Sequence, residues 1–285
     1  MEQMWDSPLG GLSREKEIPH GVGNFLYGVL FAVCKIAFRY RVEGIENLRG
    51  FYQKSGVVLV CNHTSFLDTV FLYLSVRPTQ WARFFARDDL FDNAGGFFGH
   101  VISRVGAFPV KRNTADLTAI KRAARMLKNC EVVGVYPEGT RRGRGTKPSE
   151  IHSGVAMIAR MGKAPLLPMT VRDAELIKQK GKFVRFPKVT VEFGAPLLLS
   201  DFDILPKEER LDACSWYVMR ECFALSLRCP ADEVDMVVLF PTSKDYAAFF
   251  RQHPIAPHTT EELLALQVKA PASAATPNLV RGGQS

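Results

Sequence analysis

The first forty residues change from a polar to an apolar pattern. Residues 1–20 are mostly polar and are interrupted by proline and glycine, which predicts a flexible leader rather than a cleaved signal peptide. From residue 21 to 41 the chain is apolar and aromatic, with Asn24 and Lys35 as its only strongly polar residues before Arg39. This change of pattern separates the two segments.

The apolar segment 21–41 predicts a membrane-associated helix. Its apolar stretch, residues 21–38, is slightly shorter than the roughly 20 residues that cross a bilayer. Lys35, Arg39 and Arg41 close it with positive charge, as expected for a helix held among anionic headgroups. A buried core helix and a single membrane crossing are the two alternatives, because helices of both kinds are also apolar all round.

Beyond residue 42, short β-branched runs alternate with helical patterns. Buried strands are expected at 56–61, 131–136, 164–171 and 188–193, and helices at 65–76, 115–129 and 153–161. This alternation predicts an α/β fold, a layered sheet flanked by helices, over residues 42–229.

The pattern weakens toward the end of the chain. Residues 230–268 are expected to form a C-terminal extension, with one more strand at 234–240. Residues 269–285 are rich in Ala, Pro, Ser and Gly, which predicts a disordered tail.

Composition and net charge indicate which classes of partner the protein could bind. The 285 residues carry a formal net charge of +8, which favours partners with phosphate, such as an anionic bilayer, a phosphorylated substrate or nucleic acid. No recognition-helix or RNA-binding motif accompanies the charge, so no nucleic-acid partner is expected. The six cysteines lack the close pairs of metal and redox sites, so no metal is expected either.

Residues 62–68 (N-H-T-S-F-L-D) lie where a predicted strand passes into a helix, a usual place for functional groups in α/β sheets. Asp68 lies about one helical turn beyond Ser65, close enough to reach the imidazole of His63. A carboxylate on one ring nitrogen leaves the other to accept a proton from a hydroxyl, which makes a general base. The alternative is structural, because Ser65 and Asp68 also fit a helix capping box.

Two further segments place basic residues in loops after strands. Residues 136–142 (Y-P-E-G-T-R-R) contain Glu138 and Arg141, and the guanidinium of an arginine matches phosphate oxygens. Glu138 is expected to orient an arginine, to accept a hydrogen bond from a substrate hydroxyl, or to be an exposed turn residue. Lys111 and Arg112 follow another apolar run, and two basic residues before a loop are by themselves more typical of a solvated face.

Taken together, these segments resemble the glycerolphosphate acyltransferase superfamily, in particular bacterial 1-acyl-glycerol-3-phosphate acyltransferases. Residues 62–68 match its motif N-H-x-S-x-x-D, and residues 136–141 match (F/Y)-P-E-G-T-R in full. Residues 106–112 and 166–171 are similar to its second and fourth motifs. The chain departs from the pattern at His152, where many members carry a lysine.

The resemblance implies a role for each matched residue. His63 would deprotonate the acceptor hydroxyl, Asp68 would hold His63, and the alkoxide would attack an acyl thioester directly. Arg112 and Arg141 would hold the phosphate of the acceptor with the help of Lys111. The remaining residues expected to shape that pocket are Glu138, Gly139 and Thr140.

The resemblance also implies substrates and location. We expect transfer of a fatty acyl group from acyl-ACP (acyl carrier protein) or acyl-CoA (coenzyme A) to lysophosphatidic acid, giving phosphatidic acid in phospholipid biosynthesis, without metal or bound cofactor. The alternatives are acylation of glycerol 3-phosphate or another lysophospholipid, and a catalytically silent lipid-binding module. A serine-type esterase is not expected, because no G-x-S-x-G is present. The expected place is the cytoplasmic face of the cell membrane, peripheral, monotopic or single-span.

Overall fold

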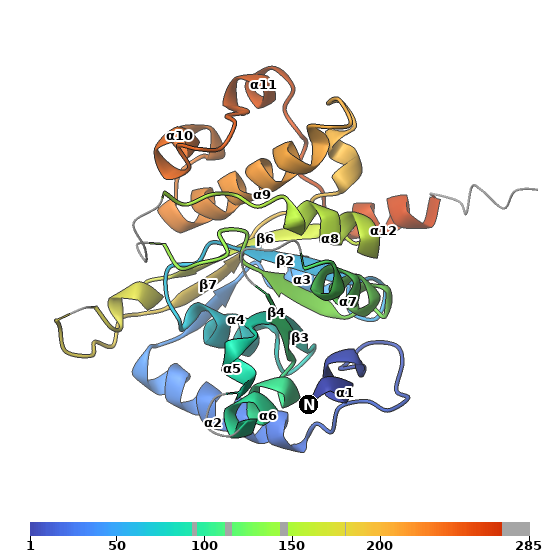
Figure 1. Cartoon of the computed structure of the whole chain (residues 1–285). Coiled ribbons are helices and arrows are strands. Elements are labelled where there is room, and N and C mark those ends of the chain that lie inside the picture. Colours follow the sequence, from blue (N-terminus) through green and yellow to red (C-terminus); the bar gives the residue numbers. More distant parts are fainter. Residues whose placement is uncertain (93–95, 112–115, 143–147, 180, 270–285) are drawn as a thin grey trace, which may run out of the picture.

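A computed structural model of the chain describes residues 1–92, 96–111, 116–142, 148–179 and 181–269. Within these ranges the chain folds around one sheet with helices on both faces (Figure 1). The predicted disordered tail, apart from residue 269, lies outside the described residues.

The sheet has seven strands in the order β1-β7-β6-β2-β5-β3-β4. Strands β6, β2, β5, β3 and β4 are mutually parallel, whereas β7 runs antiparallel to β6 and β1 runs parallel to β7. Every residue of β2 and β6 is buried, because helices cover both faces of these central strands. The strand bounds are β1 (Arg41–Glu43), β2 (Val57–Cys61), β3 (Ala82–Arg87), β4 (Ala107–Val110), β5 (Val132–Val135), β6 (Leu166–Arg172) and β7 (Thr190–Phe193).

Two apolar cores fill the space between the sheet and its helices. One lies under α7, α8 and α9 and includes Val58 and Val133, and the other lies under α2 and α4 and includes Val57 and Leu59. Alternate residues of β2 thus enter opposite cores, as the pleat of a strand requires. The longer helices are α2 (Gly21–Ala37), α4 (Asp68–Val76), α6 (Phe97–Arg104), α7 (Leu117–Lys128), α8 (Gly154–Gly162), α9 (Arg210–Leu227) and α12 (Thr260–Lys269).

Short helical segments complete the fold: α1 (Glu2–Asp6), α3 (Glu46–Arg49), α5 (Asp89–Asp92), η2 (Ala174–Leu176), η3 (Leu199–Phe202), η4 (Ala231–Glu233), α10 (Met236–Leu239) and α11 (Ala247–Gln252). The α/β alternation expected from the sequence is confirmed. The strand expected at 234–240 is wrong, because this segment forms α10, whose Met236 packs with Phe240 into the core under α9.

The first twenty residues differ from the expected flexible leader. Leu9 and Ile18 are buried against the rest of the chain. The guanidinium of Arg83, itself buried at 0% exposure, donates hydrogen bonds to the backbone oxygens of Trp5 and Ser7. A buried arginine needs acceptors, and the leader supplies two of them.

Helix α2 is covered by the rest of the protein on one side only. It packs on α4 and α6 through one side, where Gly23 and Cys34 are buried, and it exposes the other side. Among the described residues, no helix combines the length and the apolar composition needed to cross a membrane. The single-span alternative therefore has no support.

Candidate active site

The parallel strands place two motif segments side by side. Strand β2 ends at Cys61 and its neighbour β5 ends at Val135, so residues 62–68 and 136–142 leave the same edge of the sheet. Asn62 is fixed here by Thr170 of β6, whose Oγ1 donates to Oδ1 of Asn62 at 2.9 Å. The edge lies at the carboxyl ends of the strands, where α/β proteins bind their ligands.

His63 and Asp68 meet as the sequence predicts. Nδ1 of His63 lies 3.0 Å from Oδ2 of Asp68, and Asp68 is 0% exposed at the start of α4. No described residue hydrogen-bonds Nε2 of His63, and the side chain keeps 15% of its surface exposed. This arrangement leaves Nε2 to accept a proton from a hydroxyl.

Asp68 contacts backbone groups of the turn as well as His63. Its Oδ2 also accepts hydrogen bonds from the backbone N–H groups of Thr64 at 2.8 Å and Ser65 at 2.7 Å. The second of these is half of the expected capping box. The same oxygen therefore fixes the turn that carries His63 and orients its imidazole.

The 136–142 loop holds His63 from the other side. The ring of Tyr136 stacks on the imidazole with centroids 4.2 Å apart. A carboxylate oxygen of Glu138 accepts from the His63 N–H at 3.0 Å, and the Arg142 N–H donates to the His63 carbonyl at 2.8 Å. The backbone and the ring of His63 are thus fixed by separate contacts.

Glu138 is not an exposed turn residue. It is 4% exposed, and burial raises the pKa of its carboxyl although Arg142 pairs with it at 3.0 Å. Its two carboxylate oxygens face the N–H of His63 and the guanidinium of Arg142, so Glu138 holds both residues in place.

Arg142 and Tyr136 are the residues that sequence reasoning missed. Arg142 donates to the carbonyl of Leu239 at 3.0 Å and lies 4.9 Å and 4.7 Å from the ring centroids of Phe223 and Phe240. Both residues stood inside the quoted motif, but no spacing rule reveals a ring stacked on an imidazole or an arginine tied to a helix a hundred residues away. Arg142 thereby connects the candidate site to the C-terminal extension.

Gly139 and Thr140 shape the same loop. Gly139 has φ of +63°, which favours glycine, and an added Cβ would lie 3.4 Å from the ring of His152. The N–H of Thr140 donates to the Glu138 carbonyl at 2.7 Å. His152 therefore lies against the loop, and its N–H donates to the Pro137 carbonyl at 3.1 Å.

The structure separates the residues expected to bind phosphate. Arg141 lies 5.7 Å from the ring of Phe66, inside the turn of His63. Lys111 follows β4, which is the third strand from β2 in the sheet. At the usual spacing of ~4.8 Å between neighbouring strands, β4 lies about 14 Å from β2. Lys111 lines a hollow of about 350 Å³ with Asp88, Asp92 and Asp116. Arg112 lies outside the described residues.

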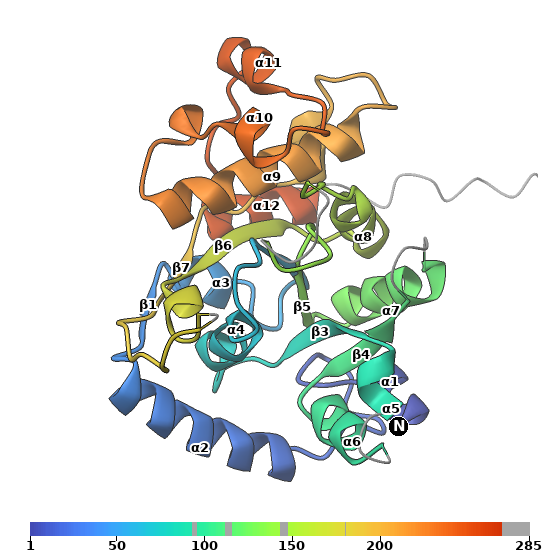
Figure 2. The ribbon, with the colours of Figure 1, turned by 60° about the vertical axis from the view of Figure 1, so that its left-hand side comes forward.

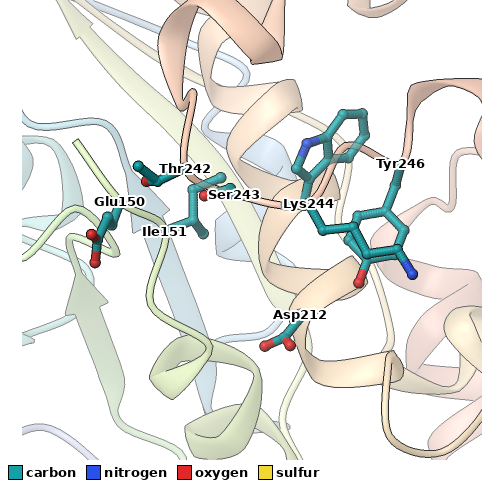
Figure 3. A pocket seen from close by; sticks show the side chains of 8 residues that line it. Glu150, Ile151, Asp212, Thr242, Ser243, Lys244 and Tyr246 are labelled. Carbon is teal, nitrogen blue, oxygen red and sulfur yellow. The ribbon is translucent and has the colours of Figure 1, made fainter. Parts of the chain in front are cut away.

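A second hollow, of about 310 Å³, lies beside α9. Figure 3 shows Glu150 and Ile151 on one wall and Asp212, Lys244 and Tyr246 on the other. His63 lines neither hollow. Within the described part of the chain, no group of three or more His, Cys, Asp or Glu side chains is arranged to hold a metal ion. The candidate site is therefore defined by the contacts of His63.

Comparisons with known proteins relate the chain to acyltransferases. The family described as "Acyltransferase" matches residues 39–172. A 1-acyl-sn-glycerol-3-phosphate acyltransferase of Bacillus subtilis is 33% identical over 189 residues, covering 66% of this chain and 89% of the relative. The enzyme of the same name from Streptococcus pneumoniae is 29% identical over 174 residues, covering 61% of this chain and 60% of the relative.

A solved structure extends the comparison to the fold. The 1-acyl-sn-glycerophosphate (LPA) acyltransferase PlsC from Thermotoga maritima is similar with a TM-score of 0.50 and 24% identity. The match covers 71% of this chain and 81% of the other. At this sequence identity the similarity supports the fold and not the function.

Proposed function

Because the chain belongs to the glycerolphosphate acyltransferase superfamily, we propose that it transfers a fatty acyl group from a thioester donor to the free hydroxyl of lysophosphatidic acid, giving phosphatidic acid. The observation that carries the mechanism is the contact of 3.0 Å between Nδ1 of His63 and the buried Asp68. The names of the relatives support the acceptor.

In the proposed reaction, Nε2 of His63 takes the proton of the acceptor hydroxyl as its oxygen attacks the thioester carbonyl. The tetrahedral intermediate collapses, the carbon–sulfur bond breaks, and the leaving thiolate takes the proton back from the imidazolium. Asp68 stabilises that imidazolium and keeps Nδ1 protonated. The step draws on no bound metal or cofactor.

The acceptor phosphate is assigned to basic residues near the same edge. Arg141 is the best placed of them, because its guanidinium lies over the ring of Phe66, and Phe66 belongs to the turn that carries His63. Arg112 keeps its predicted role from the family pattern, and Lys111 would contact a ligand group that extends along the sheet edge toward β4. Glu138, Gly139 and Thr140 fix the loop that carries Arg141.

Acyl-ACP and acyl-CoA are both proposed as donors, since both are acidic and suit a chain with net charge +8. We place the protein at the cytoplasmic face of the cell membrane, as a peripheral or monotopic protein held by α2. The exposed apolar side of that helix supports the placement.

The test is acyl transfer by the purified, detergent-solubilised full chain with labelled acyl-ACP or acyl-CoA. Lysophosphatidic acid, glycerol 3-phosphate and an uncharged lysophospholipid are offered in parallel. His63→Ala is expected to lower turnover by about 10²–10⁴-fold.

The chain offers a matched control for this variant. Nε2 of His258 lies 3.1 Å from Oδ1 of Asp201, a second His–Asp pair outside the candidate site. His258→Ala is expected to keep the wild-type turnover. Product from glycerol 3-phosphate alone would mean that glycerol 3-phosphate, and not lysophosphatidic acid, is the acceptor. If the folded protein formed no product from any acceptor, the result would favour the lipid-binding module.

A further inference from the structure

One face of α2 is apolar and has no cover from the described protein. Phe25 is 70% exposed and Ile36 is 83% exposed, and Val29 and Val33 lie exposed between them, with Val22 one turn before Phe25, in one stripe. Positions three and four apart share one side of a helix, so these side chains form a continuous strip. An exposed apolar strip of this kind marks a binding surface.

The two polar residues inside α2 are tied to the protein. Oδ1 of Asn24 accepts from the guanidinium of Arg77 at 2.6 Å, and Nζ of Lys35 donates to the carbonyl of Tyr40 at 3.1 Å. The exposed strip is thus apolar along its length and has a positive charge only toward its carboxyl end.

A second apolar element lies next to that end. Residues 182–188 (K-F-V-R-F-P-K), before β7, expose Phe183 at 93% together with Val184 and Phe186. The guanidinium of Arg39 donates to the Phe186 carbonyl at 3.1 Å, and the rings of Phe38 and Phe186 lie 5.7 Å apart. These contacts join the loop to the end of α2, the long blue helix along the lower edge of Figure 2.

Basic side chains surround the place where the helix and the loop meet. Within the described residues, none of them forms an ion pair with a carboxylate. They are Lys35, Arg39, Lys178, Lys182, Arg185 and Lys188, and all six residues are exposed.

We propose that the strip of α2 and residues 182–188 form one docking surface for an anionic lipid bilayer, with the loop inserting Phe183 as a second anchor beside the helix. Apolar side chains enter the boundary between headgroups and acyl chains, and the surrounding cations meet lipid phosphates. The assignment of lipid as the occupant rests on the proposed function.

Charge and position favour a bilayer over a second copy of the chain. A two-fold interface would bring the same basic cluster of both copies together, and like charges repel. The loop also belongs to the edge of the sheet that carries His63, because it leaves the carboxyl end of β6, where Arg172 pairs with Thr190. Docking through this surface would present that edge to the membrane.

The experiment measures binding of the full chain to two kinds of vesicle, phosphatidylcholine alone and phosphatidylcholine mixed with phosphatidylglycerol. Phe183→Ser is expected to lower the partition coefficient onto both by about ten-fold, since Phe183 makes almost no contact with the protein. K182Q/R185Q is expected to lower partition onto the anionic vesicles by about thirty-fold and to leave neutral vesicles unchanged.

Ile204→Ser is the matched control, because Ile204 is an exposed apolar residue whose neighbours Phe202 and Leu205 pack into the core under α7, α8 and α9, on the face of the sheet opposite α2. This variant is expected to bind as wild type. Wild-type binding by Phe183→Ser would overturn the role of the loop. Equal binding of the wild type to both vesicles would overturn the role of charge. A dimer in sedimentation that Phe183→Ser converts to monomer, without a change in vesicle binding, would assign the surface to a second copy.

Acyl transfer separates this proposal from the proposed function. Phe183→Ser is expected to keep wild-type turnover on a short-chain acceptor dissolved as monomer and to lose about ten-fold on acceptor presented in anionic vesicles. Vesicle binding as expected in a protein that transfers no acyl group would support docking and refute the enzymatic proposal.

Discussion

Replacing Asp68 by asparagine changes charge at the site and almost nothing else. Oδ2 of Asp68 accepts from Nδ1 of His63 and from the N–H groups of Thr64 and Ser65, with all three distances between 2.7 and 3.0 Å. An asparagine can place its amide oxygen at the same point and keep these donors. The imidazole then keeps its orientation and loses the adjacent negative charge.

The size of the effect follows from that charge. Two unit charges about 4 Å apart interact by about 4 kcal/mol at an effective dielectric constant of about 20. In the proposed reaction the imidazolium forms as the hydroxyl loses its proton. Removing the negative charge of Asp68 therefore destabilises the transition state more than the ground state and raises the barrier. At about 1.4 kcal/mol for each factor of ten, and with screening through the 15% of the His63 side chain that is exposed, we expect kcat to fall about 10²–10³-fold.

The stability of the fold should change much less. A neutral acceptor serving three donors costs about 1–3 kcal/mol relative to a carboxylate, against about 5–15 kcal/mol of total stability for a typical domain. Thermal unfolding followed by circular dichroism should therefore show a folded D68N variant with a lowered midpoint.

The assay is steady-state acyl transfer at saturating donor, with kcat and KM for lysophosphatidic acid measured separately. D201N is the matched control, because Asp201 also accepts from a backbone N–H and from a histidine, His258, outside the site. It should lose a similar part of its stability and keep its kcat. A D68N variant with wild-type kcat, or one that raises only KM, would refute the role assigned to Asp68.

Three further changes probe the surroundings of the site. Arg83→Met leaves Glu131, 3.6 Å away, buried without its cation and should cost about 3–5 kcal/mol in denaturant unfolding. Burial already raises the pKa of Glu131; a carboxyl with a raised pKa favours the fold at low pH, so this cost should grow as the pH rises above the ordinary titration range of a carboxyl group. Gly139→Ala forces a side chain into positive φ and should lower stability by about 1–2 kcal/mol and reduce turnover. Glu138→Gln keeps an acceptor for the His63 N–H and should retain far more turnover than Glu138→Ala, which leaves that N–H unpaired.

Local sequence patterns determined the layered fold and the central pair of the site. The run of β-branched residues at 56–61 became β2 because a fully apolar run of that length fits a strand covered on both faces. Asp68 contacts His63 because the two residues are only five positions apart, joined by a turn and the first residue of a helix, so local geometry brings them together. The error at 234–240 has a related cause. A short apolar run fits a strand and a buried helical turn equally well, so its pattern could not distinguish the two.

Only the tertiary structure decided which distant groups serve that pair. Glu138 could be an exposed turn residue or a buried partner, and the pairing of β2 with β5 decided this by bringing its loop under His63. The leader looked flexible by composition, yet it covers Arg83, whose burial depends on strands far along the chain. Likewise, the contact of Phe186 with Arg39 joins residues 147 positions apart. Short-range periodicity records which face of an element is apolar, but the partner of that face is set by strand order and packing, which no local pattern encodes.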